Sequence, residues 1–107
     1  MPLVLVALVA LVFWPRTAWA GELSGAPLFQ NHCAGCHVNG GNILRRSKTL
    51  KLAALDRNGI TGPGAIATIA AQGRGQMSGY GAVLGDGGAD AVAAYVWAQA
   101  QAGWPKA

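Results

Sequence analysis

The sequence predicts an all-α domain of three to four helices. Apolar residues recur at helical spacing in several segments, and no useful stretch alternates apolar and polar residues as a half-buried strand would. Neither an internal repeat nor a coiled-coil heptad is present. With 107 residues, the chain has room for one domain.

The first twenty residues have the pattern of an export signal. An apolar run over residues 3–14 precedes Ala18-Trp19-Ala20, the small-x-small pattern that signal peptidases accept. The run is too short to cross about 30 Å of hydrocarbon as a helix that rises roughly 1.5 Å per residue. We expect residues 1–20 to be a cleaved signal peptide and residues 21–107 to be the mature domain, which is then not embedded in a membrane. Because the run is preceded by no Lys or Arg, a retained anchor stays open as the alternative.

Two helices are predicted in the first half of the domain. Ser24 can cap a helix whose Leu28 and Phe29 face inward and which leads into residues 33–37. A loop rich in glycine and asparagine follows over residues 39–42. Ser47 then opens a short helix that ends at residues 58–59 and bears three leucines, Leu50, Leu52 and Leu55.

Two further helices are predicted in the second half, on either side of a glycine-rich segment. Pro63 occupies a first helical position, and an apolar stripe of Ile66, Ile69 and Ala70 continues until Gly73. Residues 73–88 hold seven glycines, a flexible composition that needs something to wrap around. The last helix, over residues 89–102, is expected to carry one apolar face made of Val92, Tyr95, Val96 and Gln99.

Residues 33–37, Cys-Ala-Gly-Cys-His, form a motif for covalent haem attachment. The thiols of Cys33 and Cys36 lie on one side of a helical turn, where each can add to a vinyl group of the same porphyrin. The imidazole of His37 can then bind the iron. A covalent haem c would also staple a domain whose own core is modest.

Two other chemistries stay open for these residues. In an oxidising compartment Cys33 and Cys36 could close a disulfide or act as a thioredoxin-like redox pair, although such a pair normally follows a strand. Together with His32 and His37 they could bind zinc, but adjacent His-Cys pairs converge on one tetrahedral centre only with strain. Apart from this, His32 is expected to be partly exposed and without a function.

Met77 is the predicted second axial ligand, because it is the only methionine beyond residue 20. It lies in the glycine-rich segment without hydrophobic periodicity, which argues against a core position, and a surface methionine is the alternative. A His and Met pair favours ferrous iron and leaves no open position for oxygen or peroxide. This ligand set predicts an electron carrier and no enzyme. The rival, a haem peroxidase or ligand sensor, would need a labile sixth ligand.

The charge of the chain does not indicate a nucleic-acid partner. Its formal net charge is +4, and the longest basic run is Arg45-Arg46, so nucleic-acid binding is not expected. We expect the mature protein to be a monomer.

A further set of residues accompanies the haem motif, namely Gly25-Ala26, Phe29, Gly40, Asn42, Lys48-Thr49-Leu50, Met77, Tyr80, Val92-Ala93-Ala94-Tyr95-Val96, Gln99-Ala100 and Gly103-Trp104. With these residues the chain resembles, from residue 25 to residue 104, the cytochrome c6 group of cyanobacteria and plastids. The resemblance implies the class I cytochrome c fold, in which four helices wrap one covalently bound haem. It also implies that the first and last helices cross through Gly25, Phe29 and Tyr95.

Three positions depart from the c6 pattern. Ser78 follows Met77 where the family usually has proline, which implies a looser ligand loop. Val83 stands where the family has an arginine associated with docking on photosystem I. Ile69 lies eight residues before Met77, at a place where the family has glutamine. An apolar residue there is typical of the c6-like types A, B and C, which have lower potentials, and this chain resembles those atypical members.

The resemblance implies a soluble one-electron carrier of a photosynthetic or respiratory chain, exported to the thylakoid lumen or the periplasm. The expected partners are the cytochrome b6f complex and photosystem I or a terminal oxidase, which it would meet through small and brief interfaces. Arg74 is a candidate for charge steering or for a contact to a haem propionate. The expected docking surface surrounds the haem edge and includes Val38, Ser78, Gly79 and Tyr80.

Substitution of Ile69 by glutamine tests the expected low potential. Physical arguments leave the sign open, because an apolar group disfavours ferric charge and raises the potential, whereas loss of a polar contact to the haem edge can lower it. On the strength of the resemblance, we expect Ile69→Gln to raise the midpoint potential. The rise is about 59 mV if the one-electron equilibrium changes tenfold. Potentiometric titration of parent and variant measures it, and an unchanged or lower potential contradicts the expectation.

Overall fold

The computed structural model describes residues 17–105, which form five α-helices, two 3₁₀ turns and one short β-hairpin. The all-α class is therefore confirmed. The predicted signal peptide over residues 1–20 lies mostly outside the described residues, and its cleavage stays a prediction. Over the described residues, no helix combines the length and the hydropathy that a membrane span requires. The elements are α2 (Thr17–His32), η1 (Val38–Gly40), η2 (Arg46–Lys48), α3 (Leu52–Arg57), α4 (Pro63–Gln72), β1 (Gly73–Arg74), β2 (Met77–Ser78), α5 (Gly81–Leu84) and α6 (Gly88–Ala102).

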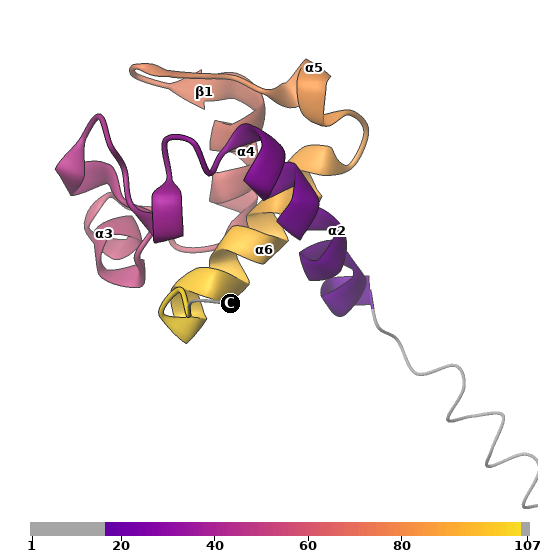
Figure 1. Ribbon diagram of the computed structural model, residues 1–107, viewed down its shortest axis with the longest axis horizontal. Helices are drawn as coiled ribbons and strands as arrows, with labels where there is room; N and C mark the ends of the chain where they lie inside the picture. The colour runs from indigo at the N-terminus through magenta and orange to yellow at the C-terminus, as the bar shows by residue number, and fades with distance from the viewer. Residues whose placement is uncertain (1–16, 106–107) are drawn as a thin grey trace, which may run out of the picture.

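Helices α2 and α6 cross in close contact, and α4 also packs against α6 (Figure 1). The crossing depends on Gly25, because a Cβ atom at this position would overlap the carbonyl oxygen of Ala91 and would approach the Cβ of Tyr95 to 2.9 Å. One turn further along α2, the ring of Phe29 packs on that of Tyr95 with 5.3 Å between centroids. The crossing that the family resemblance implies is therefore present.

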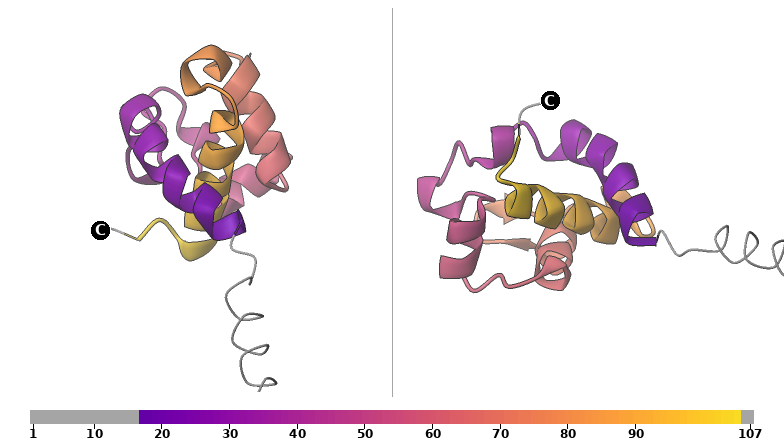
Figure 2. Two further views of the ribbon diagram at one scale, coloured as in Figure 1. Left: turned by 90° about the vertical axis from the view of Figure 1, so that its right-hand side faces the viewer. Right: turned by 90° about the horizontal axis from the view of Figure 1, so that it is seen from below.

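The hydrophobic core lies where α2, α4 and α6 meet, while α3 and α5 close its ends (Figure 2). Its largest fully buried side chains are Phe29, Leu55 and Val92. Each of these comes from a different helix, so the core ties together segments that are far apart in the sequence. The buried residues of the core are Phe29, Leu55, Ile66, Ala67, Ala70, Leu84, Val92, Ala93, Val96 and Ala100.

The two helices of the second half begin and end close to their predicted positions. Pro63 is the first residue of α4, where its missing N–H costs no hydrogen bond, and Gly73 ends the helix. Helix α6 ends at Gly103, whose left-handed backbone conformation favours glycine. Within α4, Ile66 and Ala70 are buried as predicted, whereas Ile69 is only half-buried.

Two predicted helix starts are wrong. Ser24 does not cap the first helix, because α2 begins at Thr17 and the helix-favouring residues around position 20 continue it upstream. Ser47 lies inside η2, and α3 begins only at Leu52. The reason is that the carbonyl groups of Ser47 and Lys48 accept hydrogen bonds from the side chains of Asn58 and Asn42, at 3.1 and 3.0 Å, so these two asparagines occupy the carbonyl groups that a helix beginning here would use. Leu52, expected inside, is 43% exposed.

The glycine-rich segment has more secondary structure than predicted. A β-hairpin pairs Gly73 with Ser78 and Arg74 with Met77, and the single turn of α5 follows it. The hairpin is anchored to α4 because the Tyr80 N–H donates to the carbonyl of Ala70 at 2.8 Å. The prediction of three to four helices missed α5 because four residues are too few to show a period.

Substitution of Gly25 by alanine tests the importance of the helix crossing. The added Cβ would overlap the backbone of α6, so we expect Gly25→Ala to destabilise the protein by about 1–3 kcal/mol, a cost typical of overpacking. Urea unfolding followed by circular dichroism measures the loss. The matched control is Gly64→Ala in α4, where an added Cβ has nothing within 4 Å. An equal loss of stability in both variants would contradict the assignment.

Candidate haem site

A cavity of about 440 Å³ lies among α2, α4, α6 and the loop that carries η2. Its volume falls within the range of roughly 300–1,000 Å³ that is common for cofactor sites. The walls are chiefly apolar, which suits a large flat aromatic group. The aliphatic and phenylalanine side chains that line it are Phe29, Leu44, Leu50, Leu55, Ile60, Ile66, Ile69, Ala70, Val92 and Val96.

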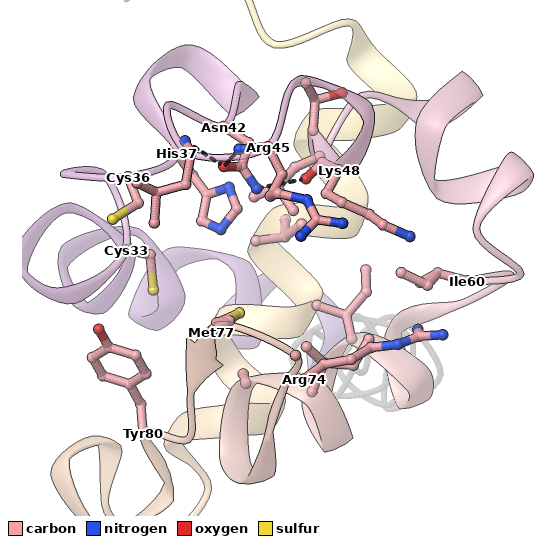
Figure 3. A pocket seen from close by; sticks show the side chains of 18 of the residues that line it. Cys33, Cys36, His37, Asn42, Arg45, Lys48, Ile60, Arg74, Met77 and Tyr80 are labelled. Atoms are coloured by element: carbon pink, nitrogen blue, oxygen red, sulfur yellow. Dashed lines mark hydrogen bonds between the residues drawn. The ribbon is translucent and has the colours of Figure 1, made fainter.

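All four residues that the sequence singles out line this cavity. Cys33, Cys36 and His37 follow the end of α2, and Met77 comes from β2. In Figure 3, His37 and Met77 approach the cavity from opposite sides, and the side chains of the two cysteines lie together toward one end of it. The fold thus brings a methionine to a place opposite a histidine that lies far from it in the sequence.

His37 is buried and its ring orientation is set by one hydrogen bond. Only 9% of the residue is exposed, and Nδ1 lies 2.7 Å from the carbonyl oxygen of Gly41. A carbonyl oxygen can only accept, so Nδ1 carries the ring proton and donates it. The lone pair of Nε2 is therefore free to bind a metal, which is the arrangement that proteins use for ligating imidazoles.

Backbone hydrogen bonds form a tight turn at the end of α2, and this turn carries the two thiols and the imidazole. The amides of Cys33 and Ala34 both donate to the carbonyl of Phe29, at 2.8 and 2.9 Å, and the amide of His37 donates to the carbonyl of Cys33 at 2.9 Å. Burial raises the pKa of the Cys33 thiol. Cys36 is exposed. A thioether at Cys33 would have no proton to lose, so burial is better suited to the bonded sulfur than to a thiolate.

Met77 is held by a hairpin that packs tightly on the last turn of α4. A Cβ atom on Gly79 would lie 2.5 Å from the carbonyl oxygen of Ala71 and 2.7 Å from the carbonyl carbon of Gln72. Only a glycine lets the two backbones come this close. The methionine itself is half-buried and lines the cavity.

Polar side chains organise the rim of the cavity. The Oδ1 of Asn42 accepts from the amides of Leu44 and Arg45, at 2.9 and 2.8 Å, and its Nδ2 donates to the carbonyl of Lys48 at 3.0 Å. Lys48 in turn donates from Nζ to Oδ1 of Asn58 at 2.9 Å. This network fixes the loop that covers one side of the site.

Three basic side chains line the cavity, and the sequence predicted only one of them to lie near the haem. Arg74 is predicted near the haem, whereas Arg45 and Lys48 stand out in the sequence only as parts of a basic run and of the family pattern. All three line the cavity, and among the described residues that line it there is no Asp or Glu. His32, expected to be partly exposed, is half-buried and also lines the wall.

These residues fit a covalently bound haem. The cavity joins apolar walls, a buried imidazole with a free Nε2, a methionine across from it and two thiols at one end. Zinc fits less well, because no group of three or more His, Cys, Asp or Glu in residues 17–105 is placed to hold a metal ion.

Comparisons with known proteins place the chain among c-type cytochromes. The family model described as "Cytochrome C oxidase, cbb3-type, subunit III" matches residues 20–96. A "Cytochrome c6-like" protein of Nostoc sp. is 39% identical over 106 residues, which cover 97% of this chain and 96% of that protein. Cytochrome c6 of Aphanizomenon flos-aquae is 44% identical over 87 residues, or 81% of this chain and all of the relative.

Solved structures agree with this assignment. Cytochrome c6B from Synechococcus sp. WH8102 has a TM-score of 0.76 and 58% identity, and the match covers 78% of this chain and 96% of that one. Oxidised cytochrome c6A from Arabidopsis thaliana has a TM-score of 0.76 and 33% identity, over 81% of this chain and 97% of that one. The fold is therefore that of the class I cytochromes c. The chain belongs to the cytochrome c6 family of electron carriers, which bind a covalently attached haem c.

Proposed function

We propose that this protein is a diffusible one-electron carrier and not an enzyme, with His37 and Met77 as the two axial ligands of its iron. Cys33 and Cys36 would form the thioether bonds to the haem. The observation that carries the proposal is the placement of a buried imidazole and a thioether on opposite sides of one apolar cavity (Figure 3).

When bound, haem c supplies one iron that takes up and releases a single electron. The residues of this chain decide how that iron is held. The Nδ1–H of His37 donates to the carbonyl oxygen of Gly41, which raises the basicity of the ring and would favour the ferric state of a bound iron. The thioether of Met77 would be a softer ligand, which would favour the ferrous state. His37 and Met77 together would hold the iron, which would leave no position for a substrate.

Electron exchange with partners would take place where the cavity meets the surface. Val38, next to the haem motif, is 53% exposed, and Ser78 and Gly79, which follow Met77, are exposed as well. Apolar contact at this edge, with Arg45, Lys48 and Arg74 around the cavity, suits a weak interface that forms and dissociates quickly. We propose the cytochrome b6f complex as donor and photosystem I or a terminal oxidase as acceptor, in the thylakoid lumen or the periplasm, after removal of residues 1–20 from the domain over residues 21–107.

Substitution of Met77 by alanine tests the ligand assignment. The parent holoprotein should show the weak ferric absorption band near the red end of the visible spectrum that accompanies Met ligation. We expect Met77→Ala to abolish this band, and the ferrous form of the variant to bind CO readily because its sixth position is open. Absorption spectroscopy of parent and variant measures both effects. A high-spin spectrum or ready CO binding in the parent would instead favour a peroxidase or ligand sensor.

The partner is tested by flash-induced oxidation with purified photosystem I. Val83 is 61% exposed on α5, where the c6 pattern has arginine, so an arginine side chain could extend into solvent there. We expect slow oxidation of the parent and an acceleration of about tenfold in Val83→Arg, the lower end of electrostatic steering. The control is Ala82→Arg, which adds the same charge at an exposed position one residue away. Fast oxidation of the parent, or equal acceleration by both variants, would contradict the proposed role of position 83.

A further inference from the structure

Gly41 orients His37 through its carbonyl oxygen, and the haem motif holds Gly41 through its neighbours in the chain, since the amide of Ile43 donates to the carbonyl of Cys36 at 3.0 Å. The turn that contains it is short: the amide of Gly40 donates to the carbonyl of His37 at 3.1 Å, and the amide of Gly41 donates to that of Val38 at 2.8 Å. On its outer side the carbonyl of Gly40 accepts from the amide of Leu50 at 2.7 Å. The position of the turn therefore depends on the contacts of Gly40 and Leu50 as well as on these bonds to the motif.

Trp104, near the C-terminus, contacts both of these residues. Its indole ring lies directly on Gly40, where a Cβ atom would overlap three atoms of the ring. Its Nε1–H donates to the carbonyl of Leu50 at 3.0 Å, across 54 positions of sequence. Gly40, Leu50 and Trp104 thus form a closed set of contacts, which we name the Trp104 clamp.

Backbone hydrogen bonds at the end of α6 position Trp104 against this turn. The amide of Gly103 donates to the carbonyl of Ala100 at 3.3 Å, and the amide of Trp104 donates to that of Gln99 at 2.8 Å. This pair of bonds is the Schellman motif, in which a left-handed glycine reverses the chain at a helix end. Trp104 itself has a positive φ of 55°, which is uncommon for a bulky residue.

Aromatic neighbours hold the indole ring in this unusual backbone conformation. Its centroid lies 5.4 Å from that of Phe29 and 6.2 Å from that of Tyr95. A residue in a sparsely populated backbone region persists only when its surroundings determine it strongly. Here the aromatic neighbours, the Nε1–H bond and the close contact with Gly40 all do so.

We infer that Trp104 is a positioning residue for His37. Its ring and its Nε1–H hold the turn over residues 38–41, from which Gly41 fixes the imidazole. The inference rests on the proposed role of His37 as an iron ligand. Loosening of the clamp weakens the bond from Nδ1–H to Gly41, lowers the basicity of the ring, and so destabilises the ferric state.

The test compares Trp104→Phe with Trp97→Phe in the holoprotein. Trp104→Phe keeps an aromatic ring but removes the N–H group that bonds Leu50. Trp97 is a half-buried tryptophan of α6, the helix that Trp104 follows. It lines a separate hollow with Leu52 and Asp56, so its substitution perturbs the core without touching the clamp. The readouts are exchange of the His37 ring N–H, followed by NMR in the ferrous protein, and the midpoint potential.

We expect Trp104→Phe to accelerate exchange of the His37 ring N–H by roughly fivefold, as loss of one hydrogen bond worth about 1 kcal/mol would. The midpoint potential should rise. Trp97→Phe should change neither quantity, even where it lowers the unfolding temperature to a similar extent. Trp104→Leu, which also removes the aromatic ring, should give a larger effect.

Two outcomes would overturn the inference. One is a Trp104→Phe protein that is less stable but keeps the parent's ring N–H exchange and potential. The other is an equal change in both phenylalanine variants. The absorption spectrum of the parent reports separately on the proposed ligands, so an absent Met band would reject the proposed function without bearing on the clamp. If Trp104→Leu fails to fold, Trp104→Phe still decides the question.

Discussion

The close crossing of α2 and α6 is the contact on which the rest of the structure depends. It requires a residue without a side chain at Gly25, because the backbone of α6 occupies the space where a Cβ atom would lie. The crossing sets Phe29 against Tyr95, and from Phe29 the chain turns into the segment with the two cysteines and His37. The same helix α6 supplies Val92 and Val96 to the cavity wall, so one contact places both the haem motif and the wall behind it.

The two sides of the cavity are held by different means. On the histidine side, the ring is buried, its Nδ1–H is bonded to a carbonyl, and Trp104 covers the turn that provides that carbonyl. On the methionine side, backbone contacts predominate: Met77 sits in a two-residue strand that is anchored through Tyr80 and pressed on α4 at Gly79. The family resemblance implied a looser ligand loop because Ser78 replaces proline. In the structure, the backbone at Gly79 packs closely against the last turn of α4.

The departures from the c6 pattern fall at the cavity or on the surface near it. Ile69 is half-buried and lines the cavity. The presence of isoleucine in place of the glutamine of the c6 pattern therefore alters the polarity of the cavity wall. Val83 is exposed on α5 and does not line the cavity. One departure can therefore act on the potential and the other on docking, and the two can vary independently.

Local patterns along the chain predicted the all-α class, the haem motif and both ends of α4, because these depend on local spacing, on proline and on glycine. It also singled out Met77, since no other methionine lies beyond residue 20. Local patterns failed at Ser24 and Ser47, and they did not show the hairpin or α5. At Ser47 the competing hydrogen bonds come from Asn42 and Asn58, which are near only in the folded chain. Only in the folded chain do Arg45 and Lys48 line the cavity and does Trp104 lie on Gly40. These contacts join positions that are distant in sequence, and local sequence patterns do not predict which distant residues come into contact.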